Sequence, residues 1–286
     1  MLVYGLINSA VLALMALGFN LTFGISGVAN FAYGAIYVVA GFVAWGLMDK
    51  LHAPLPVAIG ITIALAAIFG FYLYGLILKR IRGLVISEVI ATFAVSLVML
   101  ELLRYIGFIG FRYSLPVFID GSVEILGAFV DIQRLLIIGF GVVILFALYM
   151  FTHYTRMGLA FRGIAQEEHT SLSLGINPDR IAAWSMGLGS ALGAFAAVVI
   201  LPLGTITVDS GYDVLINALS VCIVGGLGST FGVILASFII GYAQTLTATY
   251  ISSHYTMIVS LVAILIILAV KPSGLFGRQK ELEERV

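Results

Sequence analysis

The chain has 286 residues, of which 62% are hydrophobic and only 10% are charged, and its 14 basic and 14 acidic residues cancel to a formal net charge of zero. Soluble globular domains carry about 25% charged residues, so this composition, with a mean hydropathy of +1.16, excludes a soluble globule. The lack of net positive charge also argues against a protein that binds nucleic acid.

Apolar segments long enough to cross a bilayer follow one another along the whole chain. A transmembrane helix needs about 20 mainly apolar residues. Charges, prolines and polar turns divide the sequence into candidate spans at residues 2–24, 29–48, 54–78, 85–103, 135–151, 181–203, 214–227, 231–250 and 255–270. The sequence therefore predicts an all-α polytopic membrane protein with eight or nine transmembrane helices, some of them broken or re-entrant, in a single domain that covers residues 1–286.

The first and the seventh spans are the two irregular cases. The N-terminal sequence MLVYGLINSAVLALMALG has neither a positively charged start nor a small-residue cleavage site, so we expect a membrane span there and not a removable signal peptide. Segment 214–227 has only 14 residues and runs into the glycines of VGGLGST. It is either a full span or a re-entrant half-helix, which is tolerated only when buried in protein. The predicted count is therefore nine or eight crossings.

Basic residues gather in two of the polar connections and in the C-terminal tail, and short cytoplasmic loops are enriched in Lys and Arg. Ten residues are therefore expected to face the cytoplasm: Lys79, Arg80, Arg82, Arg156, Arg162, Arg180, Lys271, Arg278, Lys280 and Arg285. With nine crossings, the N-terminus lies outside together with the other four basic residues: Lys50, Arg104, Arg112 and Arg134. With eight crossings the N-terminus is cytoplasmic, whereas the C-terminus is cytoplasmic in both arrangements.

Two glycine-rich stretches, at residues 18–30 and 217–230, also carry polar side chains. Small residues let helices pack closely in lipid, which explains many of the 32 glycines. Glycines that interrupt a span beside polar groups are typical of the broken helices that line transport routes. A Leu-Ile-Asn tripeptide accompanies each stretch, at residues 6–8 and 215–217, and this short repeat is a weak sign of internal duplication. The expected pathway residues are Asn20, Thr22, Ser26, Asn30, Asn217 and Ser220.

Two acidic residues lie inside the predicted spans, and both have structural explanations. Ser87 is expected to cap the fourth span, which places Glu88 in its first turn, where the helix dipole favours a carboxylate. Glu101 lies three residues before Arg104, a spacing that pairs opposite charges on a helix. The spans thus lack the ionisable residues of an ion-driven transporter. The chain also has no catalytic motif, no nucleotide-binding loop and no metal-ligand spacing around Cys222, so we expect no enzyme activity and no cofactor or metal.

The most polar internal segment is residues 153–180, HYTRMGLAFRGIAQEEHTSLSLGINPDR. Its periodicity predicts an amphipathic helix over residues 158–174 that Gly175 ends, ahead of Pro178. The apolar residues of one face are Phe161, Ile164, Ala165 and Leu172. A helix that lies in the headgroup plane usually carries Lys and Arg on its polar face. Because this helix also carries two adjacent glutamates, we favour docking on a protein partner over docking on lipid.

The pattern of this loop, R-x-G-x-A-x-R-x-x-A-Q followed by L-G-I-N, resembles the ATPase-docking loop of ABC importer permeases, specifically those of the branched-chain amino-acid uptake family. The resemblance extends to GLINSAVLALMALGFNLTFGISGVANFAYGA, VGGLGSTFGVILASFIIG and KPSGLFG, and thus to nearly the whole chain. The length and the N-terminal pattern are similar to those of the H-type permease. Val28 and Glu88 are departures from the family pattern.

The resemblance implies a permease subunit of a heteromeric importer in the bacterial inner membrane. Its implied partners are a second, M-type permease, two cytoplasmic ATPase subunits that hydrolyse the ATP, and a periplasmic substrate-binding protein. The residues expected to couple it to the ATPases are Gly158, Arg162, Gln166, Glu167, Glu168, Gly175 and Asn177. Branched-chain amino acids are the favoured substrates, with other amino acids, urea and amides as alternatives within the family. A stand-alone secondary transporter or channel is the alternative from another class.

Overall fold

The computed structural model describes residues 1–108, 113–125 and 128–277, and within these ranges the regular structure is almost entirely helical. The α-helices are α1 (Leu2–Ser26), α2 (Tyr33–Asp49), α3 (Leu55–Leu76), α4 (Val85–Ile106), α5 (Ile132–Tyr154), α6 (Arg156–Gln166), α7 (Glu168–Ser173), α8 (Pro178–Ile200), α9 (Ser210–Gly225), α10 (Thr230–Tyr250) and α11 (Thr256–Val270). The shorter elements are the 3₁₀ helices η1 (Leu78–Arg80), η2 (Leu201–Leu203) and η3 (Ser253–Tyr255) and the strands β1 (Ser122–Ile125) and β2 (Ala128–Asp131). The prediction of an all-α polytopic protein is confirmed, with one small antiparallel hairpin that we did not predict.

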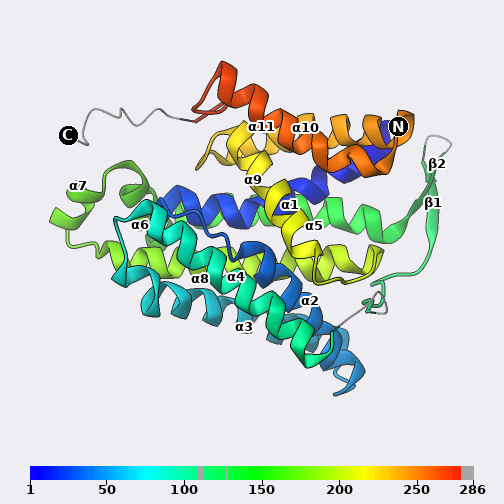
Figure 1. Cartoon of the computed structure of the whole chain (residues 1–286), viewed down its shortest axis with the longest axis horizontal. Helices are drawn as coiled ribbons and strands as arrows, with labels where there is room; N and C mark the ends of the chain where they lie inside the picture. Colours follow the sequence, from blue (N-terminus) through cyan, green and yellow to red (C-terminus); the bar gives the residue numbers. More distant parts are fainter. Residues whose placement is uncertain (109–112, 126–127, 278–286) are drawn as a thin grey trace.

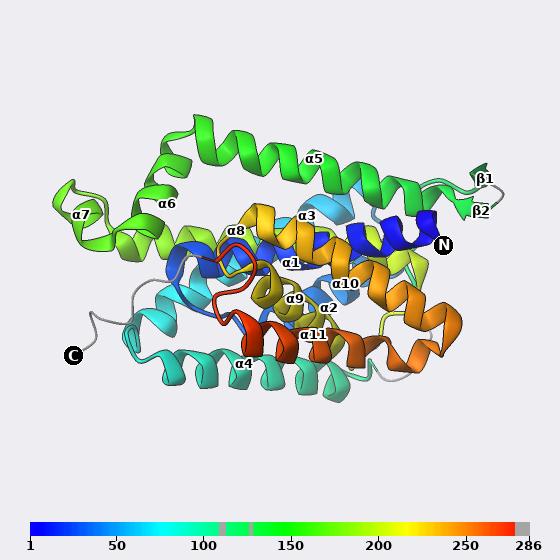
Figure 2. The same ribbon diagram turned by 90° about the horizontal axis from the view of Figure 1, so that it is seen from above.

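The long helices run roughly parallel to one another along the longest dimension of the molecule (Figure 1). Seven of the described segments are long and apolar enough to cross a membrane, and they contain α1, α3, α4, α5, α8, α10 and α11. The other two predicted spans are the shorter helices α2 and α9, with 17 and 16 residues. Figure 2 shows the start of α1 and the end of α11 at opposite ends of the bundle, which fits an odd number of passes.

The connections with many basic residues lie toward one end of the bundle. The α3–α4 connection, the helices α6 and α7 and the end of α11 all lie away from the N-terminus (Figure 2). Lys50, Arg104 and Arg134, which were expected outside, belong to the ends of α2 and α4 and the start of α5, at the N-terminal end of the molecule. Four of the predicted orientation residues, Arg112, Arg278, Lys280 and Arg285, lie outside the described residues. The cytoplasmic assignment itself stays a prediction.

Glycine turns interrupt the bundle at both of the stretches picked out in the sequence. Gly27 ends α1 with a left-handed backbone (φ 68°), and the chain then runs without regular structure to α2. Gly226 and Gly228, with φ of 99° and 85°, form the turn between α9 and α10. The two breaks are in contact, because a Cβ built on Gly24 would lie 2.9 Å from the Cα of Gly228.

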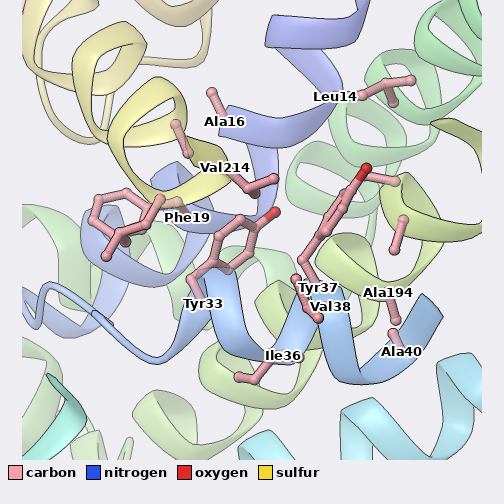
Figure 3. Close-up of a cluster of buried hydrophobic side chains, with 14 of the residues drawn as sticks. Leu14, Ala16, Phe19, Tyr33, Ile36, Tyr37, Val38, Ala40, Ala194 and Val214 are labelled. Carbon is pink, nitrogen blue, oxygen red and sulfur yellow. The ribbon is translucent and has the colours of Figure 1, made fainter. Parts of the chain in front are cut away.

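The centre of the bundle is formed by α1 and α8 with α2 and α9 packed against them. Tyr33 and Tyr37 of α2 are fully buried and point toward α1, where Figure 3 shows Tyr33 beside Phe19. Two glycines make room for the Tyr33 ring: a Cβ on Gly18 of α1 would lie 2.7 Å from its hydroxyl, and one on Gly193 of α8 would lie 2.9 Å from a ring carbon. Small residues thus let the helices approach as expected for packing in lipid.

The two acidic residues of α4 have structural roles, although one detail of the prediction was wrong. The helix begins at Val85, with Leu84 and not Ser87 at the capping position. Glu88, 5% exposed, reaches back and accepts a hydrogen bond from the Gly83 backbone N–H at 2.9 Å, so its carboxylate ties the turn before the helix to the first turn of α4. Glu101 pairs with Arg104 as predicted, and Arg104 also binds Asp209 at 2.5 Å.

Candidate functional site

The loop of residues 153–180 folds back on the bundle at the end remote from the N-terminus (Figure 2). Thr155 caps α6, because its hydroxyl accepts the Gly158 N–H at 2.9 Å. A Cβ on Gly158 would lie 2.1 Å from the carbonyl oxygen of Phe151, so this position requires glycine for α6 to pack against the end of α5. The buried face of α6 carries Phe161 and Ile164, as predicted.

The prediction of one continuous helix over residues 158–174 was wrong. Glu167 has an extended backbone (φ −150°), so the segment is two short helices, α6 and α7, with α7 starting at Glu168. The change of direction turns Leu172 outward, where it is 56% exposed and not buried with Phe161. Helical periodicity missed the break because apolar residues recur at helical spacing on both sides of it.

The other expected coupling residues lie along this surface. Gln166 and Glu167 are exposed, whereas Arg162 is half-buried and its Nε has no hydrogen-bond partner among the described residues. Gly175 follows α7 with a left-handed backbone (φ 83°), a conformation that favours glycine. Asn177 caps α8, since its Oδ1 accepts the Arg180 N–H at 3.2 Å.

A cluster that sequence reasoning missed ties this loop to the α3–α4 connection. Asp179, in the first turn of α8, accepts hydrogen bonds from Arg82 Nη1 at 2.6 Å and from the Tyr74 hydroxyl at 3.2 Å. Lys79 Nζ lies 3.6 Å from its other oxygen. The Asn-Pro-Asp sequence signals an acidic helix start, but its partners come from about 100 residues earlier in the chain. Asp179 therefore links the start of α8 both to α3 and to the α3–α4 connection.

The cap at Asn177 leads to a stability prediction. We expect Asn177→Ala to lower the free energy of unfolding by about 1 kcal/mol, because it leaves a backbone N–H at the start of α8 without its partner. Asn177→Asp keeps an acceptor at the same place and is expected to retain most of the stability. Thermal unfolding of the purified protein in lipid nanodiscs would measure the difference. Equal stability of the alanine and aspartate variants would show that the cap contributes nothing.

At the other end of the molecule, α1, α9, α10 and α11 surround an open cavity of about 770 Å³. Its apolar wall includes Ile7, Val11 and Leu12 of α1 and Met257 of α11. The size is within the range of small-molecule sites, which are mostly apolar with a few placed polar groups.

The polar part of the cavity is a chain of hydrogen bonds that joins the same four helices. Asn8 of α1 donates through Nδ2 to Gln244 Oε1 at 3.0 Å, and Gln244 Nε2 donates to Asn217 Oδ1 at 3.1 Å. Ser260 of α11 accepts from Gln244 Nε2 at 2.7 Å and donates to Asn217 Oδ1 at 2.9 Å. Asn8, Asn217 and Gln244 also line the cavity. We refer to these four residues as the carboxamide floor.

Charged side chains line the same cavity, which differs from the expectation that the spans contain almost no ionisable groups. The predicted seventh span began at residue 214, but α9 begins at Ser210, so Asp213 lies within the helix and faces the cavity. Arg134, from the start of α5, also lines it. Its Nε lies 3.3 Å from Asp131 Oδ2, and its guanidinium carbon is 5.7 Å from the centroid of the Tyr4 ring.

Of the six expected pathway residues, Asn217 lines this cavity and the others contact backbone elsewhere in the bundle. Asn20 Oδ1 accepts the Gly228 N–H at 2.9 Å and so joins the two glycine breaks. The hydroxyls of Thr22, Ser26 and Ser220 each donate to a carbonyl one turn earlier, and Asn30 Oδ1 accepts the Ala32 N–H. The structure does not bring the six together in one cavity, and their role in the pathway stays a prediction.

The cavity residues Asn8, Asp213 and Gln244, and Ser260 behind them, were not predicted. Polar side chains within apolar spans were a usable signal for Asn8 and Gln244, because such residues commonly bond across helices in membranes. Their convergence depends on how α1, α9, α10 and α11 pack, since Asn8 and Gln244 lie 236 positions apart in the chain. Helix packing of this kind is not visible in a local sequence pattern.

Comparisons with known proteins agree with this architecture. The profile of the family described as "Branched-chain amino acid transport system / permease component" matches residues 1–268. The high-affinity branched-chain amino acid transport system permease protein LivH of Salmonella typhimurium is 29% identical over 282 residues, which cover 93% of this chain and 91% of LivH. The permease protein BraD of Pseudomonas aeruginosa is 27% identical over 297 residues, which cover 97% of this chain and 95% of BraD.

The solved structure of PsaBC from Streptococcus pneumoniae in complex with Fab has a chain similar to this one in fold, with a TM-score of 0.52, coverage of 96% of this chain and 92% of that chain, and 14% sequence identity. That likeness extends to helix arrangement alone, whereas the family profile runs from residue 1 to residue 268, within α11. The chain belongs to the family of permease components of branched-chain amino acid transport systems.

Proposed function

We propose that this chain is the permease subunit of an ABC importer that moves branched-chain amino acids into the cytoplasm across the bacterial inner membrane. The observation that carries the proposal is the family match over residues 1–268, which includes the loop of α6 and α7. The relatives from Salmonella typhimurium and Pseudomonas aeruginosa are both named as permease proteins of high-affinity branched-chain amino acid transport systems. The partners in this proposal are a second permease of the M type, two ATPase subunits and a periplasmic substrate-binding protein.

In this proposal the ATPase subunits dock on α6 and α7. Leu159, Leu172 and Leu174 support the assignment, because they are 62%, 56% and 76% exposed on a loop whose other exposed side chains are mainly polar. Exposed apolar side chains at such a place fit contact with another protein. ATP-driven closure of the ATPases moves this loop, and the movement reaches α8 directly and the α3–α4 connection through Asp179.

The substrate enters through the cavity between α1, α9, α10 and α11, at the end remote from the ATPases. Its apolar wall suits an aliphatic side chain, and the carboxamide floor supplies polar contacts. The predicted residue Asn217 is part of this floor. Asn20, Thr22, Ser26, Asn30 and Ser220 then belong to the deeper part of the route, which opens when the helices rearrange.

ATP-dependent uptake tests the proposal. We expect proteoliposomes that contain this chain with its encoded partners to accumulate radiolabelled leucine when ATP is supplied, and we expect isoleucine and valine to compete. Proteoliposomes with an ATPase subunit that binds but does not hydrolyse ATP provide the control. Competition by urea or phenylalanine alone would move the substrate to another class of the family, and uptake of none of these compounds would overturn the substrate assignment.

A proton-coupled secondary transporter is the second candidate, because a carboxylate, Asp213, faces the cavity. This candidate predicts leucine uptake driven by a proton gradient in vesicles that lack the ATPase subunits. ATP-dependent uptake together with no gradient-driven uptake in the same vesicles would exclude it.

A further inference from the structure

One backbone carbonyl fixes the direction of every hydrogen bond in the carboxamide floor. The Gly241 carbonyl oxygen lies 3.1 Å from the Asn8 amide and can only accept, so the amide nitrogen of Asn8 faces it. The same nitrogen donates to Gln244 Oε1, which directs Gln244 Nε2 toward Asn217 and Ser260. Asn217 therefore presents its Oδ1 to the network. Each amide orientation follows from the previous one.

Two polar atoms are left over by this arrangement. Asn8 Oδ1 and Asn217 Nδ2 have no hydrogen-bond partner within the described part of the chain, although both side chains are half-buried. Both residues line the cavity. Leaving such groups unpaired in a partly buried place is unfavourable unless water or a ligand binds them. The floor thus presents one acceptor and one amide donor to whatever fills the cavity.

Asp213 adds a negative charge to the lining of the same cavity. It lies four residues before Asn217, and so one turn away on the same face of α9, and both residues line the cavity. Among the described residues its carboxylate has no ion pair or hydrogen bond, whereas the neighbouring Asp209 is bound by Arg104. The positive charge of Arg134 lies on the wall of the same cavity.

The position of Asp213 has a simpler structural explanation, which covers only part of these observations. A carboxylate in the first turn of α9 interacts favourably with the helix dipole. That interaction explains why an acidic residue is tolerated there. It does not explain why an amide donor is left open on Asn217 one turn away, why an amide acceptor is left open on Asn8 of α1, or why apolar residues line the same cavity.

We infer that Asp213, Asn8 and Asn217 form a recognition site for the head group of an α-amino acid zwitterion. The ammonium group binds the Asp213 carboxylate and Asn8 Oδ1, the carboxylate accepts from Asn217 Nδ2, and Arg134 lies on the wall of the same cavity. The aliphatic side chain lies along Ile7 and Val11. The inference rests on the proposed function, because the ligand is the transported substrate. A neutral ligand such as urea can donate a hydrogen bond to Asp213 but brings no positive charge to pair with it, so the site selects amino acids over urea and amides.

Protection of an introduced thiol measures binding at this site directly. Ala248 lies one turn beyond Gln244 on α10 and lines the cavity, and the native Cys222 is buried, so a water-soluble thiol reagent should label Ala248→Cys selectively. The assembled importer in proteoliposomes without ATP is used, and the leucine concentration that halves the labelling rate is recorded. We expect Asp213→Asn to raise that concentration by about tenfold or more, since it removes a hydrogen bond between charged groups.

Further variants separate recognition from a general loss of structure. Asn217→Asp keeps the oxygen that Gln244 and Ser260 bind and changes only the atom that faces the cavity, so it should weaken protection as well. Asp213→Glu keeps the charge and should therefore retain part of the protection by leucine that Asp213→Asn loses. Glu101→Gln removes a carboxylate from the same end of the protein, outside the cavity, and should leave protection unchanged. Thermal unfolding of each variant identifies any that fail to fold.

The outcomes distinguish this inference from the proposed function. Equal protection in the parent and Asp213→Asn proteins, or equal protection by leucine and by 4-methylpentanoate, which lacks the amino group, would overturn the role of Asp213. If the parent importer nevertheless takes up leucine with ATP, the proposed function stands and only the inference fails. If the parent importer takes up no leucine, the proposed function fails whatever the labelling shows.

Discussion

Alanine at position 34 is expected to destabilise the protein strongly, because it overpacks the contact between α2 and α9. A Cβ at Gly34 of α2 would lie 2.0 Å from the Gly211 carbonyl oxygen and 3.1 Å from the Leu215 Cβ of α9. The clash is with backbone, so no side-chain rotation relieves it and α2 must move away from α9. Overpacking of this kind costs about 1–3 kcal/mol, and we expect Gly34→Ala to lie at the upper end.

Gly46 provides the matched control, because it lies in the same helix and a Cβ there would meet nothing within 4 Å. Alanine is favoured over glycine inside a helix by about 1 kcal/mol, so Gly46→Ala should be neutral or slightly stabilising. Thermal unfolding of both purified variants in nanodiscs would compare them. If Gly34→Ala were as stable as Gly46→Ala, the close contact of α2 with α9 would be wrong.

The contact at Gly34 also shows what the sequence could and could not predict about the fold. Hydropathy located every helix of the bundle, because the lipid requirement for long apolar segments acts on each span separately. The beginning of α9 was missed by four residues, because the predicted span started after Asp213, whereas this residue lies in the first turn of the helix. Which glycines meet, such as Gly34 and Gly211, depends on pairs of helices and so was beyond local reasoning.

The two candidate sites differ in how far the sequence predicted them. The loop of α6 and α7 is continuous in the chain, so its position, its buried Phe161 and its end at Gly175 were predictable, and only the break at Glu167 was not. The cavity is formed by four helices that are distant in sequence. Of its carboxamide floor, only Asn217 was predicted, because the hydrogen bonds that give Asn8 its role appear only after the helices pack.

Phe161→Ala is expected to have the largest effect on coupling. Phe161 is 1% exposed, its ring centroid lies 5.6 Å from that of Phe151, and it belongs to a buried cluster with Ile25 of α1 and Ile181 of α8. Removal of a buried phenylalanine costs about 3–5 kcal/mol. A helix of 11 residues is marginal on its own, so α6 should detach from the bundle while the membrane spans stay folded.

If the proposed role of α6 is correct, the detached helix no longer transmits movement between the ATPases and the permease. We expect Phe161→Ala to reduce ATP-dependent leucine uptake by about tenfold or more, in line with the packing energy lost, while ATP hydrolysis by the assembled complex continues. Phe161→Leu fills most of the same space and should retain much of the uptake. Phe93→Ala removes the same side chain from the exposed face of α4 and serves as the control.

The ratio of leucine uptake to ATP hydrolysis shows whether Phe161→Ala loses uptake through lost coupling or through poor folding. A variant that merely folds poorly loses uptake and hydrolysis together with membrane yield, and the ratio is unchanged. A variant that loses the connection loses uptake alone, because the ATPases and the membrane spans each remain intact. An unchanged ratio in Phe161→Ala at normal yield would therefore show that force does not pass through α6, and it would direct attention to the Asp179 cluster as the remaining link between this loop and the bundle.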